Sequence, residues 1–170
     1  MNRLSINAVH GPAIVVIAGL VSGLAEVLWV GASAAVLDVD AALVARQVAA
    51  TVLPAVADST AAPWLGLAVH FALSVVLAAA FGLINERVWP HLGIGARLVA
   101  AMALLAGVWA VNFLVLLPWL NPVFTTLLPL GVTFVSKLLF ALALWGVFAA
   151  LMWNPRSPTR ANATRSMVAT

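Results

Sequence analysis

Long apolar runs separated by short polar stretches dominate the pattern of the chain. Four such runs cover residues 13–37, 62–85, 98–120 and 127–152. Each run exceeds the roughly 20 residues that an α-helix needs to cross a hydrocarbon core of about 30 Å. The pattern therefore predicts an all-α integral membrane protein with four transmembrane helices in an antiparallel, up-and-down bundle.

The stretch between the first two runs, residues 38–60, is too polar to span a membrane. Its apolar residues recur at a regular spacing instead of forming a continuous run. Its valines recur every four residues, at Val44, Val48 and Val52. Asp40 stands just before them, in the position of a helix N-cap. This spacing predicts a short amphipathic interfacial helix over 40–53 that lies on the membrane surface. We expect Arg46 and Gln47 to face water.

The two ends of the chain differ in character. The first run contains an Ala-Ser-Ala sequence at 32–34, which is typical of a signal-peptide cleavage site. The run is longer than the 7–15 apolar residues of a signal peptide, so we expect it to be retained as a span. We expect residues 1–153 to form a single four-helix domain. The polar segment 154–170 is predicted to be a disordered cytoplasmic tail.

Composition agrees with lipid as the main solvent. Of the 170 residues, 65% are hydrophobic and 8% are charged, whereas a soluble domain carries roughly 25% charged residues. So few polar groups do not cover the surface of a soluble protein of this size. The net charge of +3 comes from basic residues that flank the apolar runs. Because they form no patch, we expect no nucleic-acid partner.

The distribution of arginines predicts the orientation in the membrane. Arg46 alone falls on the side of the 38–60 stretch, together with three aspartates. Six arginines fall on the opposite side: Arg3, Arg87, Arg97, Arg156, Arg160 and Arg165. Under the positive-inside rule the side with six arginines is cytoplasmic. We therefore expect a multi-pass protein of the cell inner (plasma) membrane with both termini in the cytoplasm.

One strongly polar side chain interrupts each apolar run. At the helical rise of 1.5 Å per residue, all four lie at about 12–16 Å below the outer surface. The four residues are Glu26, His70, Asn112 and Lys137. Polar residues scattered by chance would not be expected to share a depth. The sequence therefore predicts a polar layer inside the bundle.

Small residues indicate which face of the first helix is packed. Gly19 and Gly23 are four residues apart, a spacing that lets a neighbouring helix backbone approach closely. Glu26 falls within the same arc of the helix, at 100° per residue. We therefore expect the Glu26 carboxylate to point away from lipid, into the bundle.

The lysine in the last run needs a partner, because an unpaired ammonium within the hydrocarbon is costly. Glu26 is the only carboxylate in the four apolar runs. We therefore predict an ion pair between Glu26 and Lys137. We expect His70 and Asn112 to satisfy the donors and acceptors that the pair leaves over.

Other chemistry is largely excluded. The chain has no cysteine, which rules out disulfides, thiolate metal sites and thiol catalysis. A transition metal needs three or four convergent ligands, and the polar layer offers only His70 and Glu26. We expect no metal, no cofactor and no catalytic residue, and thus a protein that is not an enzyme.

Two functions fit these observations. The first is a non-enzymatic accessory or structural subunit of a membrane complex, in which the polar layer fixes the neighbours of each helix. The second is an oligomeric small transporter or proton-relay protein that uses Glu26, His70, Asn112 and Lys137. One four-helix bundle has little room for a solute path, so transport needs at least a dimer. Expected partners are the lipid bilayer and either further copies of the chain or a larger membrane complex.

Reporter fusions test the predicted topology. Alkaline phosphatase, which is active only outside the cytoplasm, should be active when fused at residue 60 and inactive when fused at the C-terminus. Green fluorescent protein should show the opposite pattern, because it fluoresces only inside. The same side at both positions would contradict the odd number of spans, three, that is predicted between residue 60 and the C-terminus, and with it the count of four.

Overall fold

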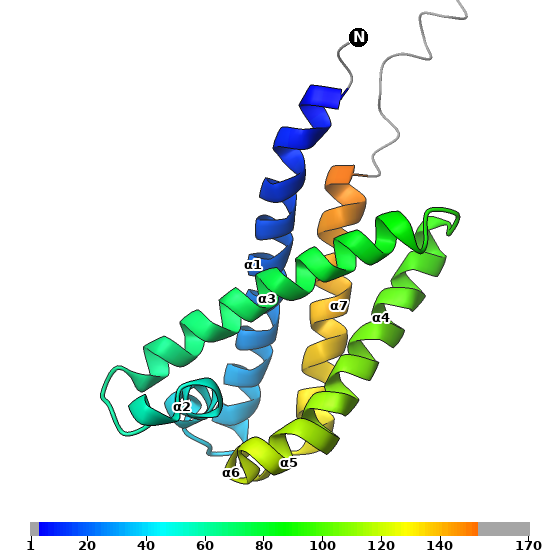
Figure 1. Cartoon of the computed structure of the whole chain (residues 1–170). Helices are drawn as coiled ribbons and strands as arrows, with labels where there is room; N and C mark the ends of the chain where they lie inside the picture. Colours follow the sequence, from blue (N-terminus) through cyan, green and yellow to red (C-terminus); the bar gives the residue numbers. More distant parts are fainter. Residues whose placement is uncertain (1–3, 153–170) are drawn as a thin grey trace, which may run out of the picture.

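A computed structural model describes residues 4–152 as helices joined by short turns (Figure 1). Within that part of the chain, four helices are long and apolar enough to cross a membrane: Gly11–Val36, Ala62–Arg87, Ile94–Leu120 and Leu130–Leu151. The predicted all-α fold with four spanning helices is confirmed. The tail predicted at 154–170 lies outside the described residues.

Three of the four spans are continuous helices: α1 (Leu4–Val36), α3 (Ala62–Arg87) and α7 (Leu130–Met152). A continuous helix is expected there, because lipid offers no partner for a backbone N–H or C=O. Successive spans alternate in direction. The start of α1 and the end of α7 therefore lie at the same end of the molecule (Figure 1).

The third span is interrupted near its C-terminal end. It consists of α4 (Ile94–Val111), a π-helical turn (Asn112–Leu116) and α5 (Leu117–Leu120). The Leu117 amide donates to the Asn112 carbonyl, five residues earlier. Pro118 lacks the N–H that would bond the carbonyl four residues before it, which accounts for a break in the α-helical pattern at this place.

The last span begins later than the apolar run beginning at 127 suggests. Residues Pro122–Leu127 form a separate short helix, α6, and Asn121 caps it by accepting from the Phe124 amide at 3.3 Å. Leu128 is extended, as expected for a residue before a proline, and so separates α6 from α7.

The helix predicted between the first two spans is confirmed as α2 (Ala41–Val52). Asp40 caps it, with its carboxylate accepting from the Ala42 amide at 2.8 Å. The expectation that Arg46 and Gln47 face water stays a prediction, since both residues are half-buried. Arg46 donates to two carbonyls of the following turn, and Gln47 Oε1 accepts from the Asn121 amide group. The turn after α2 and the turn at Asn121 supply these partners.

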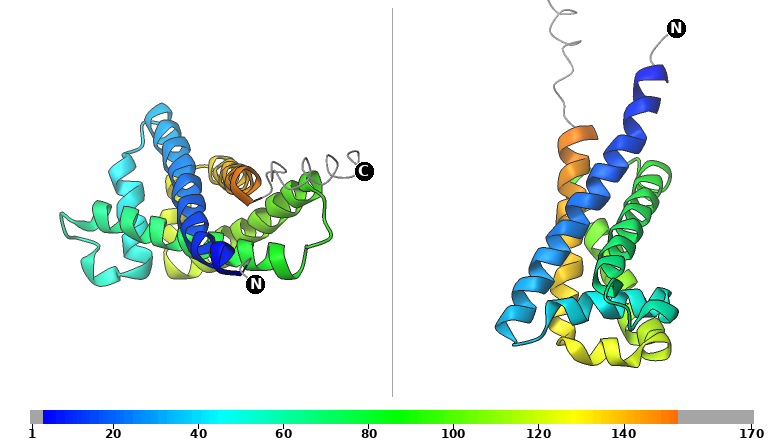
Figure 2. Two further views of the ribbon diagram at one scale, coloured as in Figure 1. Left: turned by 90° about the horizontal axis from the view of Figure 1, so that it is seen from above. Right: turned by 90° about the vertical axis from the view of Figure 1, so that its left-hand side faces the viewer.

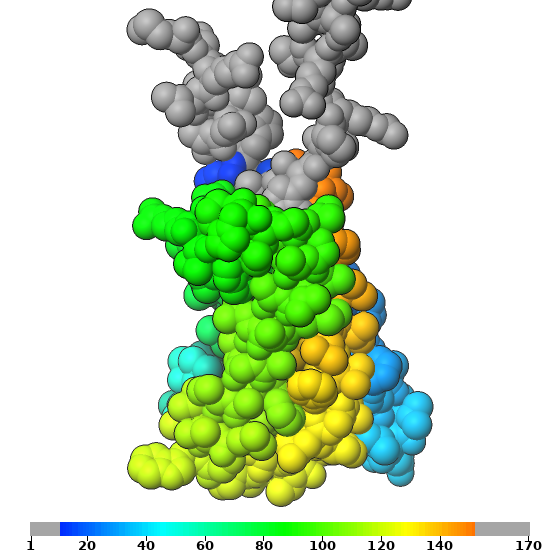
Figure 3. All heavy atoms as spheres, turned by 90° about the vertical axis from the view of Figure 1, so that its right-hand side faces the viewer, coloured from blue at the N-terminus to red at the C-terminus, as the bar shows by residue number. Residues whose placement is uncertain are grey.

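Helix packing is uneven around the bundle. α1 contacts both α3 and α7, α2 lies across α3, and α4 contacts α7 along its length (Figures 2 and 3). α3 and α4 follow each other in the chain, yet they diverge from the turn that joins them (Figure 1). The larger cluster of buried apolar residues comprises Ala18, Ala78, Phe81, Ala101, Leu105, Phe140, Ala141, Leu144 and Phe148. The bundle is therefore well packed around α7 and open between α3 and α4.

The crossing of α2 over α3 depends on Gly66. A Cβ atom there would overlap the Ala45 carbonyl group of α2. Gly66→Ala should therefore displace α2 and cost about 1–3 kcal/mol of stability, as overpacking does. Thermal unfolding of the purified protein in detergent measures this loss. Gly146→Ala, where a Cβ meets nothing within 4 Å, is the control, and equal melting temperatures would contradict the prediction.

Candidate functional site

The polar layer is centred on an ion pair between α1 and α7. Lys137 Nζ lies 2.8 Å from both carboxylate oxygens of Glu26 and donates to Oε2. Ser136 donates to Oε1 at 3.0 Å. The side chains are 14% exposed for Lys137 and 9% for Glu26. The structure thus forms the pair that the sequence predicts, and it adds a hydroxyl donor from the residue next to the lysine.

The glycines of α1 bring α3 close to the pair. A Cβ atom on Gly19 would lie 2.6 Å from Val75 Cα, and one on Gly23 would lie 2.7 Å from Ser74 Oγ. Only the absence of side chains allows this approach. α1 therefore presents its small residues to α3 while Glu26 reaches α7.

His70 and Asn112 do not bond to the pair, contrary to the sequence-based expectation. His70 Nε2 lies 3.2 Å from the Gly23 carbonyl oxygen of α1. The side chain of Asn112 makes no hydrogen bond within the described residues. The divergence of α4 from α3 separates these residues. Ser136, already on α7, supplies the third group to the pair instead.

Three tryptophans also hold helices together, which sequence reasoning missed. Each donates its indole N–H at 3.0 Å to another helix: Trp29 to the Val132 carbonyl, Trp109 to Thr133 Oγ1 and Trp145 to the Ile94 carbonyl. In every case one member of the bond belongs to α7. The available signal was the indole N–H itself, since a tryptophan within a span needs an acceptor.

A second cluster of polar residues that sequence reasoning missed joins the turn at Asn121 to α2. Asn121 is buried, and its Nδ2 lies 2.9 Å from Gln47 Oε1 and 3.1 Å from Thr51 Oγ1. The Asn-Pro pair at 121–122 is typical of a helix N-cap. The Asn-Pro pair does not reveal that Nδ2 of Asn121 reaches α2.

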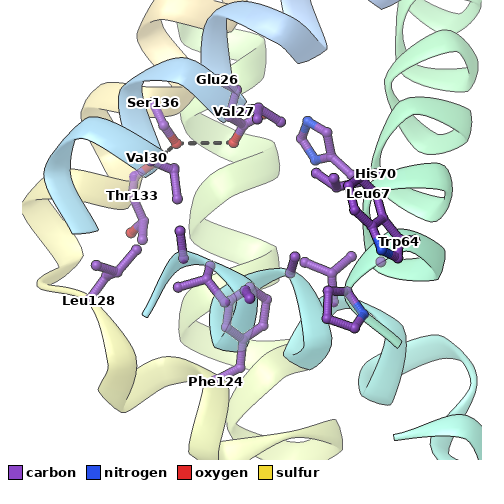
Figure 4. A pocket seen from close by; sticks show the side chains of 18 of the residues that line it. Glu26, Val27, Val30, Trp64, Leu67, His70, Phe124, Leu128, Thr133 and Ser136 are labelled. Carbon is purple, nitrogen blue, oxygen red and sulfur yellow. Dashed lines mark hydrogen bonds between the residues drawn. The ribbon is translucent and has the colours of Figure 1, made fainter. Parts of the chain in front are cut away.

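The first of two cavities lies between α1, α2 and α3, with α6 and α7 closing it (Figure 4). Its volume is about 350 Å³. Glu26 and Ser136 lie on one wall, and His70 lies on the opposite wall (Figure 4). The rest of the lining is mainly apolar, with Leu67 and Phe124 among its larger side chains.

The second cavity occupies the opening between α3 and α4 and has a volume of about 920 Å³. Lys137 and Asn112 line it, together with Gly107 of α4. Glu26 and His70 line both cavities. The polar layer therefore stands where the two spaces adjoin.

Among the side chains that the structure describes, those of residues 11–151, no group of three histidines or carboxylates lies close enough together to hold a metal ion. Comparison of the chain with protein families, curated proteins and solved structures finds no match.

Removal of one member of the pair should be costly. Glu26→Gln leaves the Lys137 ammonium without its anion, and Lys137→Met leaves the Glu26 carboxylate without its cation. An uncompensated buried charge of this kind typically costs about 3–5 kcal/mol of stability. The double variant should recover much of that loss. Unfolding free energies in detergent test this, with Glu86→Gln at the exposed end of α3 as the control. Strictly additive losses would show that the two residues are not coupled.

Proposed function

We propose that this small polytopic membrane protein, with its four candidate spans, is a non-enzymatic accessory or structural subunit of a membrane complex. Its proposed location is the cell inner (plasma) membrane, with both termini cytoplasmic, as the arginine distribution indicates. Two features support this role, namely the bonds that the polar layer forms between helices and the opening between α3 and α4.

The first feature is that the polar layer holds helices together. Glu26 of α1 receives hydrogen bonds from Lys137 and Ser136 of α7. Trp109 of α4 bonds to α7 one turn away, at Thr133. Polar groups used in this way fix the register of three helices, a role well attested for buried polar groups.

The second feature, which carries the proposal, is the unfilled opening between α3 and α4. On α4, Ala103 and Gly107 line it at a spacing of four residues, which permits close approach of another helix. At its outer part, the Asn112 amide has no hydrogen bond within the described residues. An unpaired amide inside a membrane is unfavourable, and a polar side chain from a partner helix would satisfy it.

The size of the opening agrees with a helix docked against its edge. One helical turn occupies on the order of 400–600 Å³, given a diameter of 10–12 Å and a pitch of 5.4 Å. A cavity of about 920 Å³ therefore holds the side chains along one face of a helix rather than a whole spanning helix. We propose that a transmembrane helix of a partner subunit covers α3 and α4 in this manner.

A second candidate is a small transporter or proton-relay protein that works as an oligomer. It is favoured by the position of Glu26 and His70, which line both cavities. The bonds that hold Glu26 favour the structural role, because its two oxygens already face Lys137 and Ser136. The state of assembly separates the two candidates.

Photo-crosslinking tests the docking surface. A benzoylphenylalanine at position 107 should crosslink to a membrane protein in the native membrane, because Gly107 lines the α3–α4 opening. The same substitution at Gly146, outside both cavities, is the control. A different subunit supports the accessory role, and a second copy of the chain supports the oligomeric transporter. Crosslinks to lipid alone at both positions contradict both.

A further inference from the structure

The cavity beneath α2 has the features of a small-molecule site. Its volume of about 350 Å³ falls at the lower end of the roughly 300–1,000 Å³ that ligand pockets occupy. Most of its wall is apolar, and its polar groups gather at one end, where Glu26 and His70 face each other (Figure 4). An apolar body with one polar group therefore matches this space.

The polar end offers hydrogen-bond acceptors. A carboxylate has about four acceptor sites, and Glu26 uses part of them for Lys137 and Ser136. His70 Nε2 faces the Gly23 carbonyl, which can only accept, so Nε2 carries the hydrogen. In the neutral ring Nδ1 is then an acceptor, and it has no hydrogen bond within the described residues. A matching ligand must supply a donor.

Charge narrows the class of donor. Lys137 lies 2.8 Å from the Glu26 carboxylate and already compensates its charge. A cationic ligand would add an unmatched positive charge, and an anionic ligand would be repelled by the carboxylate. Both are costly in a site of low polarity. A neutral hydroxyl meets neither penalty.

We propose that this cavity binds a small, neutral, apolar molecule that carries one hydroxyl or phenol group. The hydroxyl lies between Glu26 and His70 and donates to one of them. The apolar body lies toward α2 and α6, against Val30, Leu67 and Phe124. This ligand site adjoins the α3–α4 opening at Glu26 and His70, which line both cavities, but it does not depend on the docking of a partner helix in that opening.

Three ligands that share a 4-butylphenyl group test the proposal on the full-length protein in detergent. They are 4-butylphenol, its methyl ether 4-butylanisole, which lacks the donor, and 4-butylbenzoate, which is anionic. Binding can be followed by titration calorimetry. The phenol should bind at least about tenfold more tightly than the ether, as expected for a hydrogen bond to a charged or buried acceptor. The benzoate should bind more weakly than the phenol.

Two variants locate the site. Gly31→Phe should abolish phenol binding by filling the cavity, since Gly31 lines it and a Cβ there meets nothing within 4 Å. Gly131→Phe is the matched control, because Gly131 is equally open and lines neither cavity. His70→Leu should reduce the preference for phenol over ether while ether binding persists. Equal affinities for phenol and ether, preference for the benzoate, or unchanged binding to Gly31→Phe would each overturn the proposal.

Discussion

The ion pair between Glu26 and Lys137 constrains the rest of the fold. It joins the first and last helices at a depth where neither charge is stable alone. Once α1 and α7 are held side by side, the other spans attach to one of them. α3 packs on α1 through Gly19 and Gly23, and α4 packs on α7. α3 and α4 thus pack on different helices, and they lie apart from each other.

The same rule of polar satisfaction organises the end of the molecule where α2, α5 and α6 lie. There the chain turns twice, through α2 and through α5 and α6, and each turn exposes backbone groups that need partners. Asn121 serves both turns, since it caps α6 and bonds to Gln47 of α2. Arg46 does likewise for the turn after α2 through the Ala57 and Ser59 carbonyls. These bonds hold α2 over the smaller cavity.

The spans and the central pair were predictable because they depend on composition and depth. A run of apolar residues specifies a spanning helix whatever its neighbours are. Lys137 had a single carboxylate within reach of the same depth, so its partner followed by elimination. The cap at Asp40 was local in the same sense, because the side chain bonds only two residues ahead.

Neighbour-dependent contacts were not predictable in this way. The spans are apolar on nearly all sides, so periodicity does not say which face meets which helix. His70 reaches the Gly23 carbonyl only because α3 crosses α1 at the glycines. Asn112 is left apart because α4 follows α7 instead of α3. Tilt and divergence of this kind arise from the whole set of packed pairs.

The separation of the paired charges along the chain has a consequence for biosynthesis. Glu26 precedes Lys137 by 111 residues. At synthesis rates of about 5–20 residues per second, the carboxylate is made roughly 6–22 s before its lysine. By the end of that interval α3 has also been made and can pack on α1 through the glycines, while the carboxylate still lacks its partner. α7 is the fourth span to be made, and the buried charge is balanced only when that span is in place.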